Sequence, residues 1–253
     1  MRKLRYVRGL VAAALLVAIG GCGDNSGIPV GFAPDGRPSQ AVLLLSPVAD
    51  TLGNYVGLEA SILSPPPADG FRVYIDPAGE GFRPATEAPV PPLTSLGSGW
   101  SIYKAVVDGY DPAVPTQFVA RGARDGVESI QSPLTNVGYI PATTAAALLQ
   151  FLPVTITQPE DSTGIAPLLA WEPVPGAVSY LVQIYDVNSL PIYIALSTSN
   201  VHQFGVGPGV IFEQQPMRGG PHFMLVQAVD VGSRIIGVNL ALYSFSVTVP
   251  PTP

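Results

Sequence analysis

Few residues in this chain can do covalent or acid–base chemistry: there is one cysteine, Cys22, and there are two histidines, His202 and His222. Cys22 follows Ile19, Gly20 and Gly21, directly after an N-terminal apolar run. A single cysteine excludes an intramolecular disulfide and any Cys-x-x-Cys redox or zinc motif. The position of this thiol is therefore the first indication of its chemistry.

The first 21 residues have the pattern of a secretory signal peptide: four positive charges within eight residues, a short apolar run and small residues before a cleavage point. The apolar run of about ten residues is too short to cross a bilayer, which needs about 20. Its ending, Ile19-Gly20-Gly21-Cys22, resembles the lipobox of bacterial lipoproteins. That resemblance implies cleavage before Cys22 and covalent attachment of lipid to its sulfur. An unmodified cysteine after an ordinary signal is the alternative.

The same resemblance implies a location. Two or three acyl chains on Cys22 would anchor the chain stably, because each buried CH2 contributes about 0.8 kcal/mol. Gly23 stands where many lipoproteins of the inner membrane carry aspartate, so the outer membrane of the cell envelope is favoured, with the chain periplasmic or surface-exposed. Residues 22–40, rich in Gly, Pro, Asn and Ser, are predicted to be a flexible tether of about 24 Å.

Catalytic motifs are lacking. Neither histidine is accompanied by a Gly-x-Ser-x-Gly elbow, and we expect His202 to lie in a loop or at a strand start and His222 within a strand. Metal motifs are also missing, although Asp108 with Asp111, and Glu160 with Asp161, are close carboxylates that calcium could use at domain ends. We expect these acids to be solvated turn residues, and we predict a non-catalytic protein without a metal or other cofactor.

Aromatic side chains remain as possible binding groups. The two tryptophans differ in context: Trp171 lies in a strand pattern and is expected in the core, whereas Trp100 follows Gly97-Ser98-Gly99 at a strand start. Trp100 is the better candidate for an exposed binding aromatic, with core packing as the alternative. Stacking on a sugar ring or a partner protein would be its function.

The charge balance excludes some partners. Removing residues 1–21 takes away four of 12 basic residues and none of 18 acidic ones, which leaves 8 minus 18, a net charge of −10. An acidic chain of this kind does not fit nucleic acid or a polybasic contact with anionic lipid. The 28 prolines, 27 glycines and 47% hydrophobic residues suit many short strands joined by turns.

The chain from residue 41 onward predicts an all-β fold, in which short alternating runs recur between turn residues. We expect two tandem antiparallel β-sandwiches over residues 41–140 and 154–250. Between them, residues 141–153 form a linker in which 142–152 (ATTAAALLQFL) has helical spacing, with Thr143 or Thr144 as cap and Pro153 as stop; a strand is the alternative there. The expected strands are 41–45, 55–62, 71–75, 100–107, 118–123, 168–171, 180–185, 192–196, 223–229 and 240–249.

The two halves resemble each other. Phe71–Asp76 matches Tyr180–Asp186 in outline, and Ala123-Arg124-Asp125 matches Ala228-Val229-Asp230, at offsets of 109 and 105 residues. Such offsets are close to the length of one sandwich domain. Two copies of one module are the simplest account.

Residues 154–249 resemble a fibronectin type III domain. The resemblance is densest from Leu169 to Tyr185, and it implies a core tryptophan (Trp171) and a third strand beginning at Tyr180. It also implies inward alternation of Met224, Val226 and Ala228. The family's tyrosine-corner position falls on His222, which puts that hydrogen bond in doubt. The first copy matches less well: Leu58, Ala60 and Ile62 suggest its second strand and Phe71, Val73 and Ile75 its third, and another immunoglobulin-like sandwich is the alternative.

Three functions remain open from the sequence. The first is a non-catalytic envelope lipoprotein that presents two sandwich modules to another envelope or extracellular protein, or that acts as a spacer. The second is a lipoprotein that binds a glycan or another cell-wall polymer. The third is an accessory subunit of a secreted hydrolase. The sandwich fold hosts many unrelated functions and does not choose among them.

Overall fold

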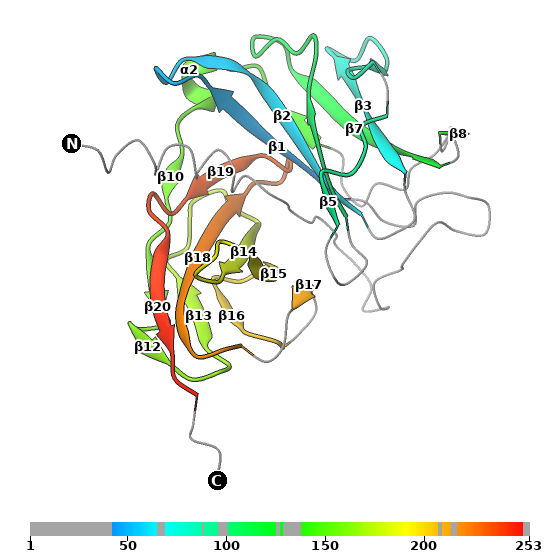
Figure 1. Cartoon of the computed structure of the whole chain (residues 1–253). Helices are drawn as coiled ribbons and strands as arrows, with labels where there is room; N and C mark the ends of the chain where they lie inside the picture. The colour runs from blue at the N-terminus through cyan, green and yellow to red at the C-terminus, as the bar shows by residue number, and fades with distance from the viewer. Residues whose placement is uncertain are drawn as a thin grey trace. The chain divides into compact units, whose positions relative to one another are not determined.

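A computed structural model of the chain describes residues 42–64, 69–87, 89–95, 101–124, 127–128, 138–206, 209–213 and 217–249. The chain divides into two compact units (Figure 1). Of the described residues, unit 1 contains those from 42 to 150 with Gly232–Arg234, and unit 2 contains those from 151 to 231 and from 235 to 249. The described residues form twenty strands and one short helix, so the all-β prediction is confirmed.

Unit 1 contains two antiparallel sheets. One has the strand order β1-β2-β6-β5, and the other has the order β4-β3-β7-β8, with β9 also paired to β7. Their bounds are β1 Val42–Ala49, β2 Tyr55–Ser64, β3 Gly70–Pro77, β4 Arg83–Pro84, β5 Thr94–Ser95, β6 Ser101–Val106, β7 Thr116–Arg124, β8 Val127–Glu128 and β9 Gly138–Ile140.

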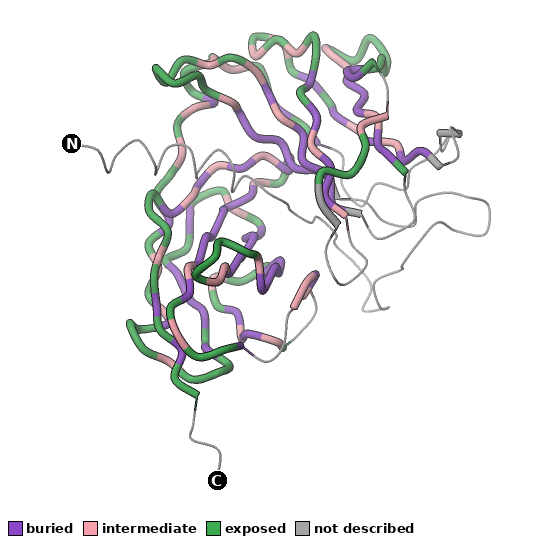
Figure 2. Tube along the Cα trace, in the orientation of Figure 1, coloured by how far each residue is buried: buried purple, intermediate pink, exposed green. Residues whose placement is uncertain are grey.

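The core of unit 1 draws alternate residues from both sheets (Figure 2). Strand alternation sends every second side chain to one face, and the inward residues here are fully buried. They include Leu58, Ala60 and Ile62 from β2 and Phe71, Val73 and Ile75 from β3. Both segments thus lie in strands, as predicted.

Unit 2 also contains two sheets. The smaller has the order β11-β13-β16, and the larger has the order β10-β19-β18-β14-β15-β17, with β20 paired to both β18 and β12. Most pairs are antiparallel, but β10–β19 and β12–β20 are parallel. The bounds are β10 Leu152–Pro153, β11 Ile156–Gln158, β12 Ser162–Thr163, β13 Leu168–Trp171, β14 Ser179–Tyr185, β15 Pro191–Ser197, β16 Val201–Gln203, β17 Val210–Glu213, β18 Gly220–Val229, β19 Ile235–Val238 and β20 Tyr243–Val247.

Trp171 lies at the centre of the unit 2 core, as predicted. It is 1% exposed, and its ring lies 5.2 Å from the ring of Tyr180 on the opposite sheet. Met224, Val226 and Ala228 on β18 are all fully buried in the same cluster. The inward alternation expected of that strand is confirmed.

The two units share a strand order. In unit 1 the paired series are β1-β2-β6 and β4-β3-β7; in unit 2 they are β11-β13-β16 and β15-β14-β18, with the same order along the chain. The repeated segments Phe71–Asp76 and Tyr180–Asp186 begin within the corresponding strands β3 and β14. In each unit the aspartate that ends this segment accepts a backbone N–H from the turn that follows, Asp76 from Gly81 and Asp186 from Asn188.

The predicted linker helix is much shorter than expected. Helix α2 covers only Ala145–Leu148, with the Thr144 hydroxyl accepting the N–H of Ala147 as its cap. The helical spacing over 142–152 overestimated the helix because only Leu148 of its apolar stripe is buried, whereas Leu152 is 42% exposed and begins β10. Pro153 therefore ends no helix and lies in a strand.

Candidate functional site

The predicted site residues have different outcomes. Cys22, the motif Ile19-Gly20-Gly21 and Trp100 lie outside the described residues, so their placement stays a prediction. Within the described residues, no helix has the length and apolarity needed to span a membrane. The two histidines and the two pairs of close acids lie within the described residues.

His202 is buried beside the aromatic ring of Tyr193. It lies on β16 opposite Leu169, is 8% exposed, and its Nε2 lies 2.5 Å from the hydroxyl of Tyr193 on β15. The ring of Phe204 packs 4.5 Å from the Tyr193 ring. Strand alternation points the side chain of His202 on β16 toward the core, on the same side as its partner Leu169 on β13.

Tyr193 is the hydrogen-bond partner of His202. Its hydroxyl oxygen also accepts the N–H of Gly205 at 3.4 Å, so one phenol joins the imidazole to the backbone after β16. Burial lowers the pKa of His202 and raises the pKa of Tyr193, which keeps both groups uncharged. Among the described residues, neither a carboxylate nor a serine hydroxyl contacts this imidazole.

His222 is held by the backbone of its own strand. It is 3% exposed, its Nδ1 donates to the carbonyl of Gly220 at 2.9 Å, and its ring stacks on Phe245 of β20 at 5.8 Å. The histidine therefore forms a hydrogen bond to a carbonyl two residues upstream in its own strand. The prediction that His222 lies within a strand is confirmed.

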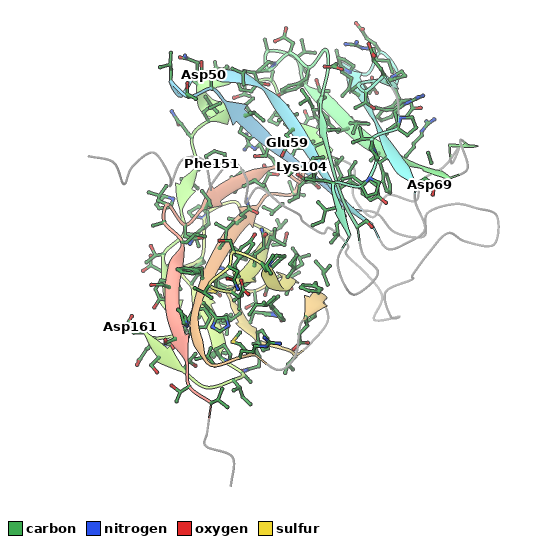
Figure 3. The ribbon with its side chains drawn as sticks, in the orientation of Figure 1. Asp50, Glu59, Asp69, Lys104, Phe151 and Asp161 are labelled. Atoms are coloured by element: carbon green, nitrogen blue, oxygen red, sulfur yellow. The ribbon has the colours of Figure 1, made fainter. Side chains whose placement is uncertain are left out.

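The close acids are turn residues in the structure. Asp111 accepts the N–H of Ala113 at 2.9 Å, and Asp161, labelled in Figure 3, is exposed with its backbone carbonyl bound to the N–H of Ser246. In the described part of the chain, no group of three or more His, Cys, Asp or Glu side chains could hold a metal ion. Asp108 and Glu160 are likewise exposed.

The charged side chains of unit 1 include a feature that the sequence does not suggest. Lys104 on β6 forms an ion pair with Glu59 on β2 at 2.6 Å, and both are labelled in Figure 3. In the other sheet, by contrast, two arginines face each other: Arg72 on β3 is directly opposite Arg121 on β7. The Cζ atom of Arg121 lies 4.4 Å from the centre of the Tyr74 ring.

Sequence reasoning missed the arginine pair because it depends on register. Arg72 and Arg121 are 49 positions apart, and only the pairing of β3 with β7 brings them together. A signal was present in each strand separately, since each arginine alternates with residues that are buried in the core. Without the register, that alternation marks each arginine only as an outward residue.

Comparisons with known proteins add little. No known protein family matches the chain, and no curated protein matches it. Among solved structures, it has a remote similarity to the crystal structure of a β-1,2-glucanase from Parabacteroides distasonis, with 12% identity and a TM-score of 0.26. The match covers 86% of this chain and 36% of that chain. A similarity at this level carries no argument about the present chain.

Proposed function

We propose that this chain is a membrane-anchored envelope lipoprotein, without catalytic activity, which presents two β-sandwich modules to another protein or acts as a spacer. The observation that carries the proposal is the segment Ile19-Gly20-Gly21-Cys22 directly after a basic and then apolar N-terminus. Acylation of Cys22 would supply the anchor, and residues 22–40 would separate the modules from the lipid.

The shared strand order supports the modular part of the proposal. Each unit has two sheets, and in each the buried core draws on both sheets, which is how a β-sandwich is built. The fibronectin type III resemblance fits unit 2 best, because Trp171 and Tyr180 pack together from opposite sheets. We assign unit 1 to the same sandwich module, with its strands β1, β2 and β6 in one sheet.

The state of the histidines supports a binding or spacing function. His202 is hydrogen-bonded to Tyr193, and His222 donates to the carbonyl of Gly220. Both side chains thus serve core packing and strand geometry. Protein contact is consistent with a rigid scaffold of this kind, because its outer faces and loops carry the recognition residues.

Metabolic labelling tests the anchor. Cells that express the full chain are fed an alkyne fatty acid, and the chain is then purified and coupled to a fluorophore. We expect strong labelling of the wild type, none of Cys22→Ser, and unchanged labelling of Gly23→Ser as the matched control. Equal labelling of wild type and Cys22→Ser would show that the lipid is not on this cysteine.

A second candidate function is glycan binding, for which the observation is Trp100 after Gly97-Ser98-Gly99. An aromatic ring at a strand start suits stacking on a sugar. A glycan and peptidoglycan array probed with the full chain and with Trp100→Ala separates the candidates. Binding that is lost in Trp100→Ala favours the glycan, whereas flat results with both proteins remove it.

A further inference from the structure

The outward face of β3 and β7 concentrates positive charge in an otherwise acidic chain. The net charge of the whole chain is −6, yet Arg72 and Arg121 occupy directly opposite positions on this face. Their neighbours Phe71, Val73 and Ala120 are buried in the unit 1 core, so alternation points both arginines away from it. Like charges directly opposite on a sheet are destabilising, and a carboxylate bound beside them would offset that repulsion.

Local contacts fix both guanidinium groups. Arg121 stacks over the ring of Tyr74, with its Cζ 4.4 Å from the ring centre, and Arg72 donates from Nη2 to the carbonyl of Glu87 at 3.2 Å. A stacked guanidinium uses its face, which leaves its N–H donors pointing outward in the plane. Among the described residues, no hydrogen bond or ion pair involves the N–H groups of Arg121. Arg121 is therefore oriented in advance for a planar acceptor.

The rest of the face continues in two further rows. Below the arginines, Tyr74 is opposite Val119, and below these, Asp76 is opposite Gln117. Tyr74 is 8% exposed, and Val119 is half-buried. The carboxylate of Asp76 accepts the N–H of Gly81 at 2.7 Å. The face thus runs from basic to apolar to polar over three rows of residues.

We propose that this face of β3 and β7 docks an acidic segment of a partner protein. A carboxylate of that segment binds Arg121 beside Arg72, in the bidentate geometry that guanidinium favours. An apolar side chain of the segment contacts the half-buried Val119, beside the Tyr74 ring over which Arg121 stacks. The proposal rests on the proposed function of protein contact and names the surface and the chemistry of the partner.

The charge distribution favours a protein segment over a polyanionic surface. A membrane or polymer that carries repeated negative charge would meet Asp76 on the same face and the net charge of −6. A short acidic segment requires only one carboxylate at the arginine row. Charge complementarity of this local kind provides specificity and partner choice.

Site-specific photocrosslinking in intact cells tests the proposal. A photoreactive residue replaces Gln117, which is exposed on this face, in the full-length chain; in a second chain it replaces Val201 on β16, which is 44% exposed. We expect position 117 to give one discrete protein adduct, which peptide mapping places on an acidic segment. Arg121→Glu should lower its yield at least about tenfold, as expected when a charge-assisted hydrogen bond is removed.

Controls separate binding from folding. Arg218→Glu makes the same charge change at an exposed arginine of unit 2 and should leave the adduct unchanged. Arg121→Gln removes the positive charge without introducing a negative one. Both Arg121→Glu and Arg121→Gln must show the unfolding midpoint of the wild type. Replacing the mapped acid of the partner by arginine should restore the adduct with Arg121→Glu.

Several outcomes would overturn the proposal. They are an adduct that persists in Arg121→Glu, an adduct on lipid or glycan, or a mapped segment without acids. Protein adducts from position 201 without any from position 117 would retain the function of protein contact and reject this surface. The lack of a protein adduct from either position would reject both.

Discussion

Asn239 should be one of the most important polar residues for the stability of unit 2. It is 5% exposed and lies between β19 and β20, where β18 changes partner. Strand β18 pairs with β19 over Gln227–Val229 and with β20 over Gly220–Met224. The side chain of Asn239 fills the gap: its Oδ1 accepts the N–H of Val226 at 2.7 Å, and its Nδ2 donates to two carbonyls.

The cost of removing this side chain follows from those bonds. The two carbonyls belong to Met224, at 3.1 Å, and to Ala241, at 2.7 Å. In Asn239→Ala the buried N–H of Val226 loses its acceptor, and the carbonyls of Met224 and Ala241 each lose a donor; a buried group left unsatisfied costs about 1–3 kcal/mol. We expect Asn239→Ala to lower the free energy of unfolding of unit 2 by about 2–4 kcal/mol. Domains of this size have only about 5–15 kcal/mol in total.

Urea unfolding measures this change, with Trp171 fluorescence as the reporter of unit 2. The Trp100→Phe background removes the other tryptophan. The control is Asn188→Ala, which removes an exposed asparagine whose Nδ2 donates to Asp186 at 3.3 Å in a hairpin turn, and it should cost well under about 1 kcal/mol. We infer that Asn239 stabilises β18 where its pairing changes from β20 to β19. A shift of the urea midpoint in Asn239→Ala no larger than that in Asn188→Ala would show that this inference is wrong.

Two further predictions concern unit 2. Because burial lowers the folded-state pKa of His202, the unfolded state binds its proton more readily, so this contribution to stability is present above about pH 6.5 and is lost as the pH falls through the folded-state pKa. Urea midpoints measured from pH 8 to 5 should fall less steeply in His202→Gln than in the wild type, and equal slopes would contradict the assignment. Gly209 has φ +92°, and an added Cβ would lie 2.2 Å from the carbonyl oxygen of Leu196. Gly209→Ala should cost at least about 1–3 kcal/mol, whereas Gly164→Ala, where a Cβ meets no atom within 4 Å, should be nearly neutral by thermal unfolding.

The long alternating strands could be predicted from the sequence, because one buried face sets a period of two. Leu58–Ile62, Phe71–Ile75 and Met224–Ala228 each lie in strands of eight residues or more. The two-residue strands, such as β10 and β12, could not be predicted, because pairing with a distant strand defines them. The same limit explains the wrong helix length: the spacing over 142–152 is helical, but burial reaches only Leu148.

The interaction candidates show this limit more strongly. Cys22 stands out because its motif is contiguous in the sequence. Arg121 and Tyr74 come together only through the register of β3 and β7, and a shift of one residue would turn either side chain to the core. Asn239 is similar, since its importance depends on where β18 exchanges β19 for β20.

The two parallel strand pairs of unit 2 determine how it would bear mechanical load. Strand β10 is the first described strand of the unit and runs parallel to β19, and β12 runs parallel to β20, the last described strand. A pull that separates the two ends of the unit acts along these strands in opposite directions. The hydrogen bonds between each pair are then loaded together, in shear, and do not open one after another. A module pulled between an anchor and a partner would resist extension first at the β10–β19 and β12–β20 pairs.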